Sequence, residues 1–202
     1  MAETAVRDRL MAALRVSAAP SSDYDLTPGI EVPDAPLREA GVLAAFHPQS
    51  GRLILTKRAS GLRHHPGQIA LPGGKVDPGD ADQTAAALRE AHEEVGLPPA
   101  QVEVLGLLPP HRTVTGFSMT PVLGIIHGDF TPTPERGEVD EVFAVPFDLI
   151  ANPANYRIER RLWRGEWRAY QTVPFGPYYI WGATARVLYA LAHRLNPHRP
   201  NP

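Results

Sequence analysis

Three glutamates, Glu90, Glu93 and Glu94, lie close together in the sequence, and Arg89 comes directly before them. At about 100° per residue of an α-helix, the glutamates fall on one face, with Arg89 beside them. Their mutual repulsion costs only a few tenths of a kcal/mol per pair, so a plain solvated face would tolerate it. Clustered carboxylate oxygens also suit hard divalent cations such as Mg²⁺ or Mn²⁺, which bind phosphates. The pattern therefore predicts a metal site with Glu90 and Glu94, one turn apart, as principal ligands.

These side chains must be presented by a helix that follows a glycine-rich turn. The stretch before Glu90 is rich in alanine, a strong helix former, and Gly96 followed by two prolines ends the helix. Gly73 and Gly74 precede it, and glycine lets a backbone approach a ligand closely. A backbone carbonyl of Gly73 or Gly74 could therefore reach the metal.

The chemistry that such a site suits is attack of water on a pyrophosphate. Bound metal neutralises the phosphate oxygens and lowers the pKa of a water molecule. We expect Glu93 to be a third ligand or the base that holds this water. Arg89, four residues before Glu93, pairs with it and fixes its rotamer. The choice of base stays open, because several carboxylates reach the same region through water.

The segment from Arg89 to Leu97 resembles the second half of the Nudix box. It reads Arg-Glu-Ala-His-Glu-Glu-Val-Gly-Leu, and Gly74 stands where the box begins. The interval between Gly74 and Arg89 is one residue longer than in the general box. It holds no Glu, and its acids are Asp77, Asp80 and Asp82. The resemblance implies a hydrolase with an α+β fold, an α/β/α sandwich around a mixed sheet in a single domain.

A second resemblance lies directly before the box. A Nudix subfamily that hydrolyses coenzyme A carries a similar pattern there, together with the longer box. Ala59 and Leu71 depart from that pattern. The residues that match are Leu55, Thr56, Arg58, Leu62, Arg63, His65, Gly67, Gln68, Ala70, Pro72, Gly73 and Gly74.

This resemblance implies cleavage of coenzyme A, or of its derivatives, to 4′-phosphopantetheine and 3′,5′-ADP. The 3′-phosphate needs a cationic clamp, and Arg58, Arg63 and His65 lie in the loop that enters the site. Gln68 belongs to the same substrate-binding set. The alternative for Arg63 and His65 is that they anchor the loop by hydrogen bonds.

Two later segments hold further candidates. Thr115-Gly116-Phe117 is similar to a Ser-Gly-Phe segment of the coenzyme A hydrolases, so Arg112 and Phe117 are expected to contact substrate, or else to form a turn with a buried Phe. In Nudix enzymes an acid after the box can complete the metal site or act as base. Glu138 and Glu141 are the candidates, and a solvated acidic loop is the alternative for each.

Composition bounds the remaining possibilities. The 202 residues carry a net charge of −2, and 43% of them are hydrophobic. The absence of cysteine excludes disulfides and a Cys nucleophile. There is no electrostatic case for a nucleic-acid or membrane partner, and no apolar run approaches the ~20 residues of a membrane span. We expect a cytoplasmic protein that binds a small molecule as a monomer or homodimer. Residues 1–36 form a helix and a Pro-rich lead-in, 37–195 the hydrolase domain and 196–202 a flexible tail.

Two other functions fit parts of this pattern. The same fold could cleave ADP-ribose or NADH, in which case a 3′-phosphate would not be required. A non-catalytic nucleotide-binding regulatory module could also keep the fold. Such modules usually lose the acids of the box, so Glu90, Glu93 and Glu94 argue against it.

Overall fold

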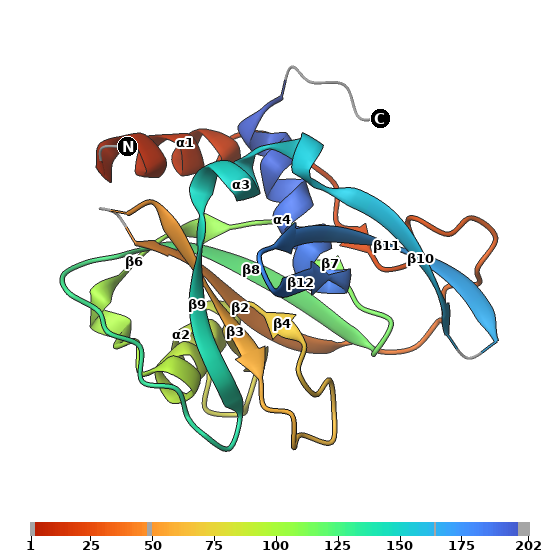
Figure 1. Ribbon diagram of the computed structural model, residues 1–202, viewed down its shortest axis with the longest axis horizontal. Coiled ribbons are helices and arrows are strands. Elements are labelled where there is room, and N and C mark those ends of the chain that lie inside the picture. Colours follow the sequence, from red (N-terminus) through yellow and green to blue (C-terminus); the bar gives the residue numbers. More distant parts are fainter. Residues whose placement is uncertain (1–2, 48–49, 164, 198–202) are drawn as a thin grey trace.

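The computed structural model describes residues 3–47, 50–163 and 165–197 (Figure 1). They form two β-sheets and four α-helices, α1 (Glu3–Leu14), α2 (Gln83–Val95), α3 (Phe147–Ala151) and α4 (Gly182–Leu195). Within these ranges no helix combines the length and apolar character needed to cross a membrane. Of the expected tail, residues 198–202 lie outside the described part of the chain.

The larger sheet positions the chemistry. Its strands follow the order β1-β7-β8-β2-β3-β4, while β5 pairs with β2, β6 with β8 and β9 with β3. β2 and β8 run parallel at the centre, whereas β3 is antiparallel to both β2 and β9. The sheet is therefore mixed, as predicted. Its strands are β1 (Ser21–Ser22), β2 (Arg38–His47), β3 (Arg52–Arg58), β4 (Ile69–Ala70), β5 (Gly73–Lys75), β6 (Val102–Leu107), β7 (His111–Arg112), β8 (Phe117–Ile126) and β9 (Val139–Pro146).

Both faces of this sheet are buried, which explains the continuous apolar run in β2. Val42, Ala44 and Phe46 join the core cluster on one face. Leu43 and Ala45 alternate with them and join the cluster under α2 on the other face. Figure 1 shows α2 on one side of the sheet and α1, α3 and α4 on the other. The predicted α/β/α sandwich is confirmed.

A smaller antiparallel sheet covers part of the face that also packs against α1, α3 and α4. It consists of β10 (Arg157–Trp163), β11 (Glu166–Phe175) and β12 (Tyr178–Trp181). β10 and β11 form a hairpin, and β12 adds a third strand that leads straight into α4. Val173 and Ile180 bury their side chains in the same core cluster as α4.

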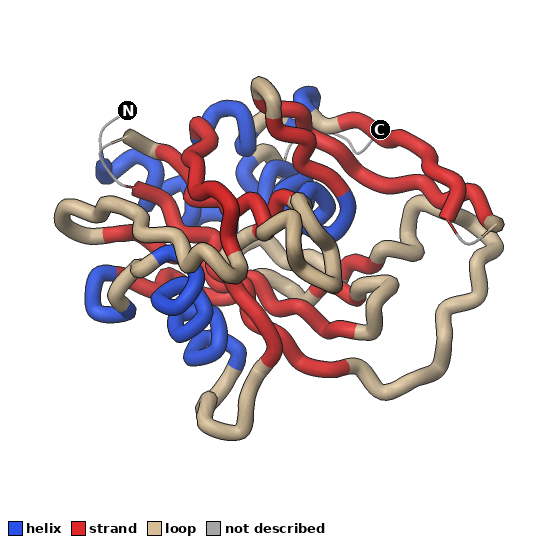
Figure 2. The backbone as a smooth tube through the Cα atoms, turned by 60° about the horizontal axis from the view of Figure 1, so that its bottom comes forward, coloured by secondary structure: helices blue, strands red, loops and turns tan. Residues whose placement is uncertain are grey.

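The segment before β2 is part of the same packed body. Val6, Leu10 and Ala13 of α1 are fully buried in the core cluster that also contains Leu188 and Leu191 of α4. The lead-in that follows α1 then forms a long excursion beside the β10–β11 hairpin before it enters β2 (Figures 1 and 2).

Candidate active site

The acidic helix α2 ends at Gly96, as its sequence predicts, and begins after Asp82. The Asp82 carboxylate caps its N-terminus by accepting the Ala85 N–H at 2.8 Å. Gly96 ends it in the left-handed conformation, with φ of +72°, which glycine adopts without strain. Ala87, Ala91 and Val95 face the sheet in the buried cluster beneath α2. The glutamates therefore project from the sides of a helix with a fixed position.

Glycines lie where β2 and β5 approach α2 closely. A Cβ atom on Gly74 would collide with the Glu90 carboxylate, and one on Gly41 of β2 would collide with the Gln83 carbonyl. The Gly73 N–H donates a hydrogen bond to Glu94 Oε2 at 3.1 Å. The predicted glycine-rich turn thus brings the backbone against the acidic side chains.

Three carboxylates converge at this point. Oxygens of Glu90, Glu94 and Glu138 all lie within 4.8 Å of one another. Glu138 comes from the segment before β9, where its backbone carbonyl accepts the Ala59 N–H at 2.8 Å. The structure therefore brings together the two predicted principal ligands and one of the two later acids.

The electrostatics of this cluster favour a cation. The Glu94 side chain is only 4% exposed, and its burial raises its pKa to about 7. Burial also raises the pKa of Glu90. The nearest arginine nitrogen to Glu94 among the described residues, Nη1 of Arg58, lies 3.6 Å from its Oε1. Oxygen atoms of three carboxylates that converge in this way fit a divalent cation, which prefers oxygen ligands.

Arg89 links the helix to the loop before it. Its Nε and Nη2 donate to the two Asp80 oxygens at 3.0 and 2.9 Å. Its Nη1 donates to Glu90 at 3.0 Å and to Glu93 at 2.8 Å. The hydrogen bonds from Arg89 lower the pKa of Asp80. Arg89 thus orients two glutamates, and its pairing with Glu93 agrees with the sequence prediction.

The acids of the longer interval now have separate roles. Asp80 makes the bidentate pair with Arg89, Asp82 caps α2, and Asp77 pairs with Lys75 at 2.7 Å. Sequence reasoning did not assign Asp80. The available signal was its carboxylate in a turn nine residues before Arg89.

Two other predicted acids lie away from the cluster. Glu93 is half-exposed and turned toward Arg89. Glu141 accepts a hydrogen bond from the Tyr178 hydroxyl, and Tyr178 stacks on Phe143 at the core of the opposite sheet face. Alternation along β9 therefore separates Glu141 from the three converging carboxylates.

The upstream loop enters directly at the acidic cluster. Arg58 at the end of β3 exchanges backbone hydrogen bonds with Gly67 and Gln68, which close the base of the loop. Arg63 and His65 are exposed on it. His65 adopts φ of +55°, a conformation that is unusual outside glycine. Partial covering of its ring, followed by the nearby Arg58, lowers the pKa of His65.

Arg112 and Phe117 have partners within the protein. Arg112 donates to the Pro33 carbonyl, and the guanidinium of Arg38 lies over the Phe117 ring at 3.9 Å from its centroid. These contacts tie β7 and β8 to the lead-in and to β2. Both side chains are half-buried.

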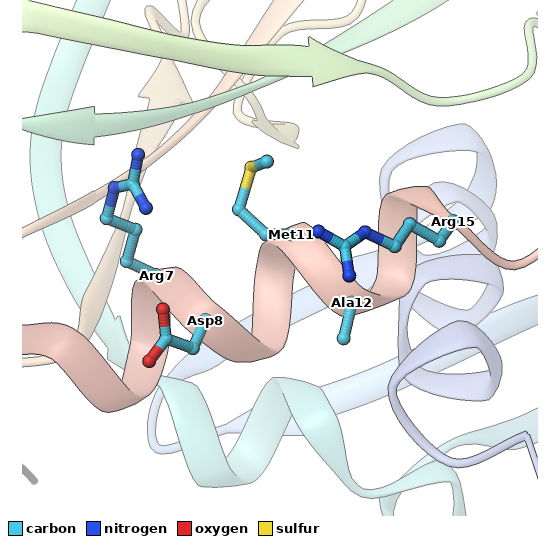
Figure 3. Close-up of a pocket in the computed structure, with 5 residues that line it drawn as sticks. All are labelled: Arg7, Asp8, Met11, Ala12 and Arg15. Atoms are coloured by element: carbon cyan, nitrogen blue, oxygen red, sulfur yellow. The ribbon is translucent and has the colours of Figure 1, made fainter.

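A surface hollow elsewhere is unrelated to this chemistry. It lies along α1 and is lined by Arg7, Asp8, Met11, Ala12 and Arg15 (Figure 3). None of the predicted site residues lines it, so it does not add to the acidic site.

Comparison with known proteins identifies the family of the chain. Residues 37–164 match the profile of the NUDIX domain family. A relative from Enterobacter sp. (strain 638), described as "Uncharacterized Nudix hydrolase NudL", is 46% identical over 160 residues, covering 77% of this chain and 81% of the relative. The protein of the same description from Escherichia coli (strain K12) is 43% identical over 157 residues, with the same coverage.

Solved structures of Nudix proteins also resemble the chain, at lower sequence identity. A MutT/nudix family protein from Enterococcus faecalis matches 82% of this chain and 65% of its own, with 17% identity and a TM-score of 0.49. The MutT protein from Methanosarcina mazei Go1 matches 59% and 83%, with 20% identity and a TM-score of 0.48. Because it matches the family profile and the curated relatives, the chain belongs to the Nudix family of hydrolases.

Proposed function

We propose that the protein hydrolyses the diphosphate of coenzyme A, or of a derivative, to 4′-phosphopantetheine and 3′,5′-ADP. One observation supports this most directly. Arg58, the first cation of the segment that resembles coenzyme A hydrolases, lies 3.6 Å from the buried Glu94 of the acidic cluster. The segment that would select the substrate therefore begins at the groups that would perform the chemistry.

We propose that Glu90 and Glu94 hold Mg²⁺ or Mn²⁺, with Glu138 as a further ligand or as the base and with the backbone at Gly74 beside them. A divalent cation bound there would neutralise the phosphate oxygens and lower the pKa of a water molecule. In the hydrolysis, the water oxygen bonds to phosphorus, the phosphorus–oxygen bond to the leaving phosphate breaks, and the water proton passes to a carboxylate. Arg89, fixed by Asp80, keeps Glu90 and Glu93 oriented throughout.

Glu93 and Glu138 are the candidates for that proton-accepting carboxylate. The Arg89 pairing holds Glu93 beside the helix, whereas Glu138 is exposed at the rim of the cluster. Glu93→Gln and Glu138→Gln separate the roles. Loss of kcat with metal affinity unchanged identifies the base, and loss of both identifies a ligand.

The exposed Arg63 and His65 are the proposed partners of the 3′-phosphate, with Gln68 at the base of their loop. Chromatography of products from coenzyme A, ADP-ribose and NADH, each with Mn²⁺, with Mg²⁺ and with EDTA, tests the function. We expect metal-dependent cleavage of coenzyme A and poor turnover of its 3′-dephospho form. Cleavage of ADP-ribose or NADH instead would keep the metal chemistry and reject the substrate. Binding of all three without turnover would favour the regulatory module.

A further inference from the structure

Three large apolar side chains are exposed on the hairpin that β10 and β11 form (Figures 1 and 2). Ile158, Leu162 and Trp167 are 58%, 55% and 64% exposed. Leu162 is the register partner of Trp167, and Ile158 is separated from Leu162 by an even number of residues, so all three lie on one face of the smaller sheet. Val173 and Ile180 continue the same face into the core. The core face of this sheet therefore extends into an exposed apolar surface.

β10 is also an open edge of the smaller sheet. In the part of the chain that the structure describes, β10 pairs with β11 alone. The outer side of β11 differs, because the lead-in lies against it and the Ala169 N–H donates to the Thr27 hydroxyl at 2.9 Å. An open strand edge offers a row of backbone donors and acceptors on which another strand can pair. The open edge and the exposed apolar face thus belong to the same hairpin.

The hydrogen bond to Thr27 also tells which backbone groups of β10 point outward. Ala169 directs its N–H away from β10, and Arg160 is its register partner. In an antiparallel pair, opposite residues either exchange both backbone hydrogen bonds or direct both groups away from each other. Arg160 therefore directs its N–H and C=O to the open edge. Ile158 and Leu162, two residues to either side, do the same.

The sequence of β10 is complementary to its own reverse. When two copies of the strand pair antiparallel about Arg160, Ile158 of one copy lies opposite Leu162 of the other, and Glu159 lies opposite Arg161. Two-fold symmetry makes each of these pairs occur twice. Apolar pairs on one face and opposite charges on the other both stabilise a sheet, whereas the two central Arg160 side chains repel. An axis at Glu159 or at Arg161 breaks both matches.

We propose that the β10–β11 hairpin is the interface of a homodimer, in which the β10 strands of two copies pair antiparallel about Arg160. The two smaller sheets then form one continuous sheet. The charge pattern selects a second copy of this chain, because Glu159 and Arg161 find their complements in the same strand reversed. Paired edge strands bury a small area, so we expect a dissociation constant on the order of 10 µM. The inference does not depend on the substrate of the acidic site.

Exchange of the two charges tests both the dimer and its register. Sedimentation velocity of the full chain between about 1 and 200 µM should show wild type passing from monomer to dimer. Glu159→Arg and Arg161→Glu each place like charges opposite each other and should weaken the dimer at least about tenfold. The double variant restores opposite charges at the same positions and should return the dissociation constant to within about threefold of wild type.

Arg160→Pro supplies a matched test of the edge. Because the Arg160 N–H points away from β11, proline fits this edge position without breaking the hairpin. The variant should unfold at nearly the wild-type temperature and yet remain monomeric. Arg160→Thr removes the central repulsion and should tighten the dimer about threefold. A wild-type protein that stays monomeric at every concentration, a double variant as weak as the single ones, or a folded Arg160→Pro variant that still dimerises would each overturn the proposal.

Discussion

The acidic site and the upstream loop differ in how they are held. The acidic residues stand on a capped helix, packed against glycines and oriented by Arg89 through five hydrogen bonds to Asp80, Glu90, Glu93 and the Lys75 carbonyl. In the loop, Arg63, His64 and His65 have exposed side chains, and the hydrogen bonds that hold the loop are made by its backbone. Chemistry needs fixed geometry, whereas recognition of a particular nucleotide can reside in a loop that a rigid scaffold presents.

The largest expected effect lies in the acidic site. Glu94→Gln keeps the shape of a fully packed side chain but removes a proposed ligand charge. We expect kcat to fall about a thousandfold, because metal stabilisation of phosphate charge supplies several kcal/mol. Steady-state kinetics with saturating Mn²⁺ measures the loss. Unchanged turnover would remove Glu94 from the metal site.

The same residue predicts a pH dependence of stability in metal-free protein. Its pKa in the folded state is raised from 4.5 to about 7. Between these values the folded state binds more protons than the unfolded state, so the free energy of unfolding falls as pH rises. Glu94 alone accounts for a decrease of about 3 kcal/mol. Urea unfolding in EDTA at pH 4.5 and pH 7.5 should show a smaller decrease for Glu94→Gln, and equal decreases would contradict the assignment.

The ion pair between Asp80, in the turn before α2, and Arg89 predicts an intermediate effect. Asp80→Asn removes the charge that orients Arg89, and we expect kcat to fall about 10- to 100-fold, as for supporting residues around a metal site. Asp82→Asn is the matched control, because Asn also caps a helix well. A similar loss in both variants would mean that negative charge in the turn before α2 matters, rather than the contact between Asp80 and Arg89.

The smallest effects belong to the loop and should be selective. Arg63→Ala and His65→Ala are each expected to raise KM for coenzyme A about tenfold and to leave its 3′-dephospho form unaffected, since a charge-assisted phosphate contact is lost. His64→Ala is the adjacent control. Parallel kinetics on the two substrates makes the test. Equal losses on both would erase the contrast between a catalytic region and a selective loop.

Much of this site could be predicted from residues that lie close together in the sequence. Helical spacing placed Glu90 and Glu94 one turn apart, and Arg89 one turn before Glu93, whatever the rest of the chain did. The cap at Asp82 and the stop at Gly96 also depend on neighbouring residues alone. The family resemblance and the mixed sandwich followed from the same contiguous stretch, which the family profile supports.

Contacts between residues far apart in the sequence could not be predicted in this way. The segment around Thr115-Gly116-Phe117, which the sequence could indicate only as a turn or a substrate contact, lies between β7 and β8, because pairing with β1 and β2 orders these strands. β12 was not predicted as a strand, since its four residues become one only by pairing with β11.

What the sequence alone determined was the acidic helix, its turn and the segment before it, because those features arise between residues close along the chain. Tertiary structure decided which later acid joins them. The register of β9 against β3 places Glu138 beside Glu94 and turns Glu141 to the other face. It also decided that Asp80 holds Arg89 and that Asp23 meets His111, since side chains far apart in sequence meet only when the sheet has formed.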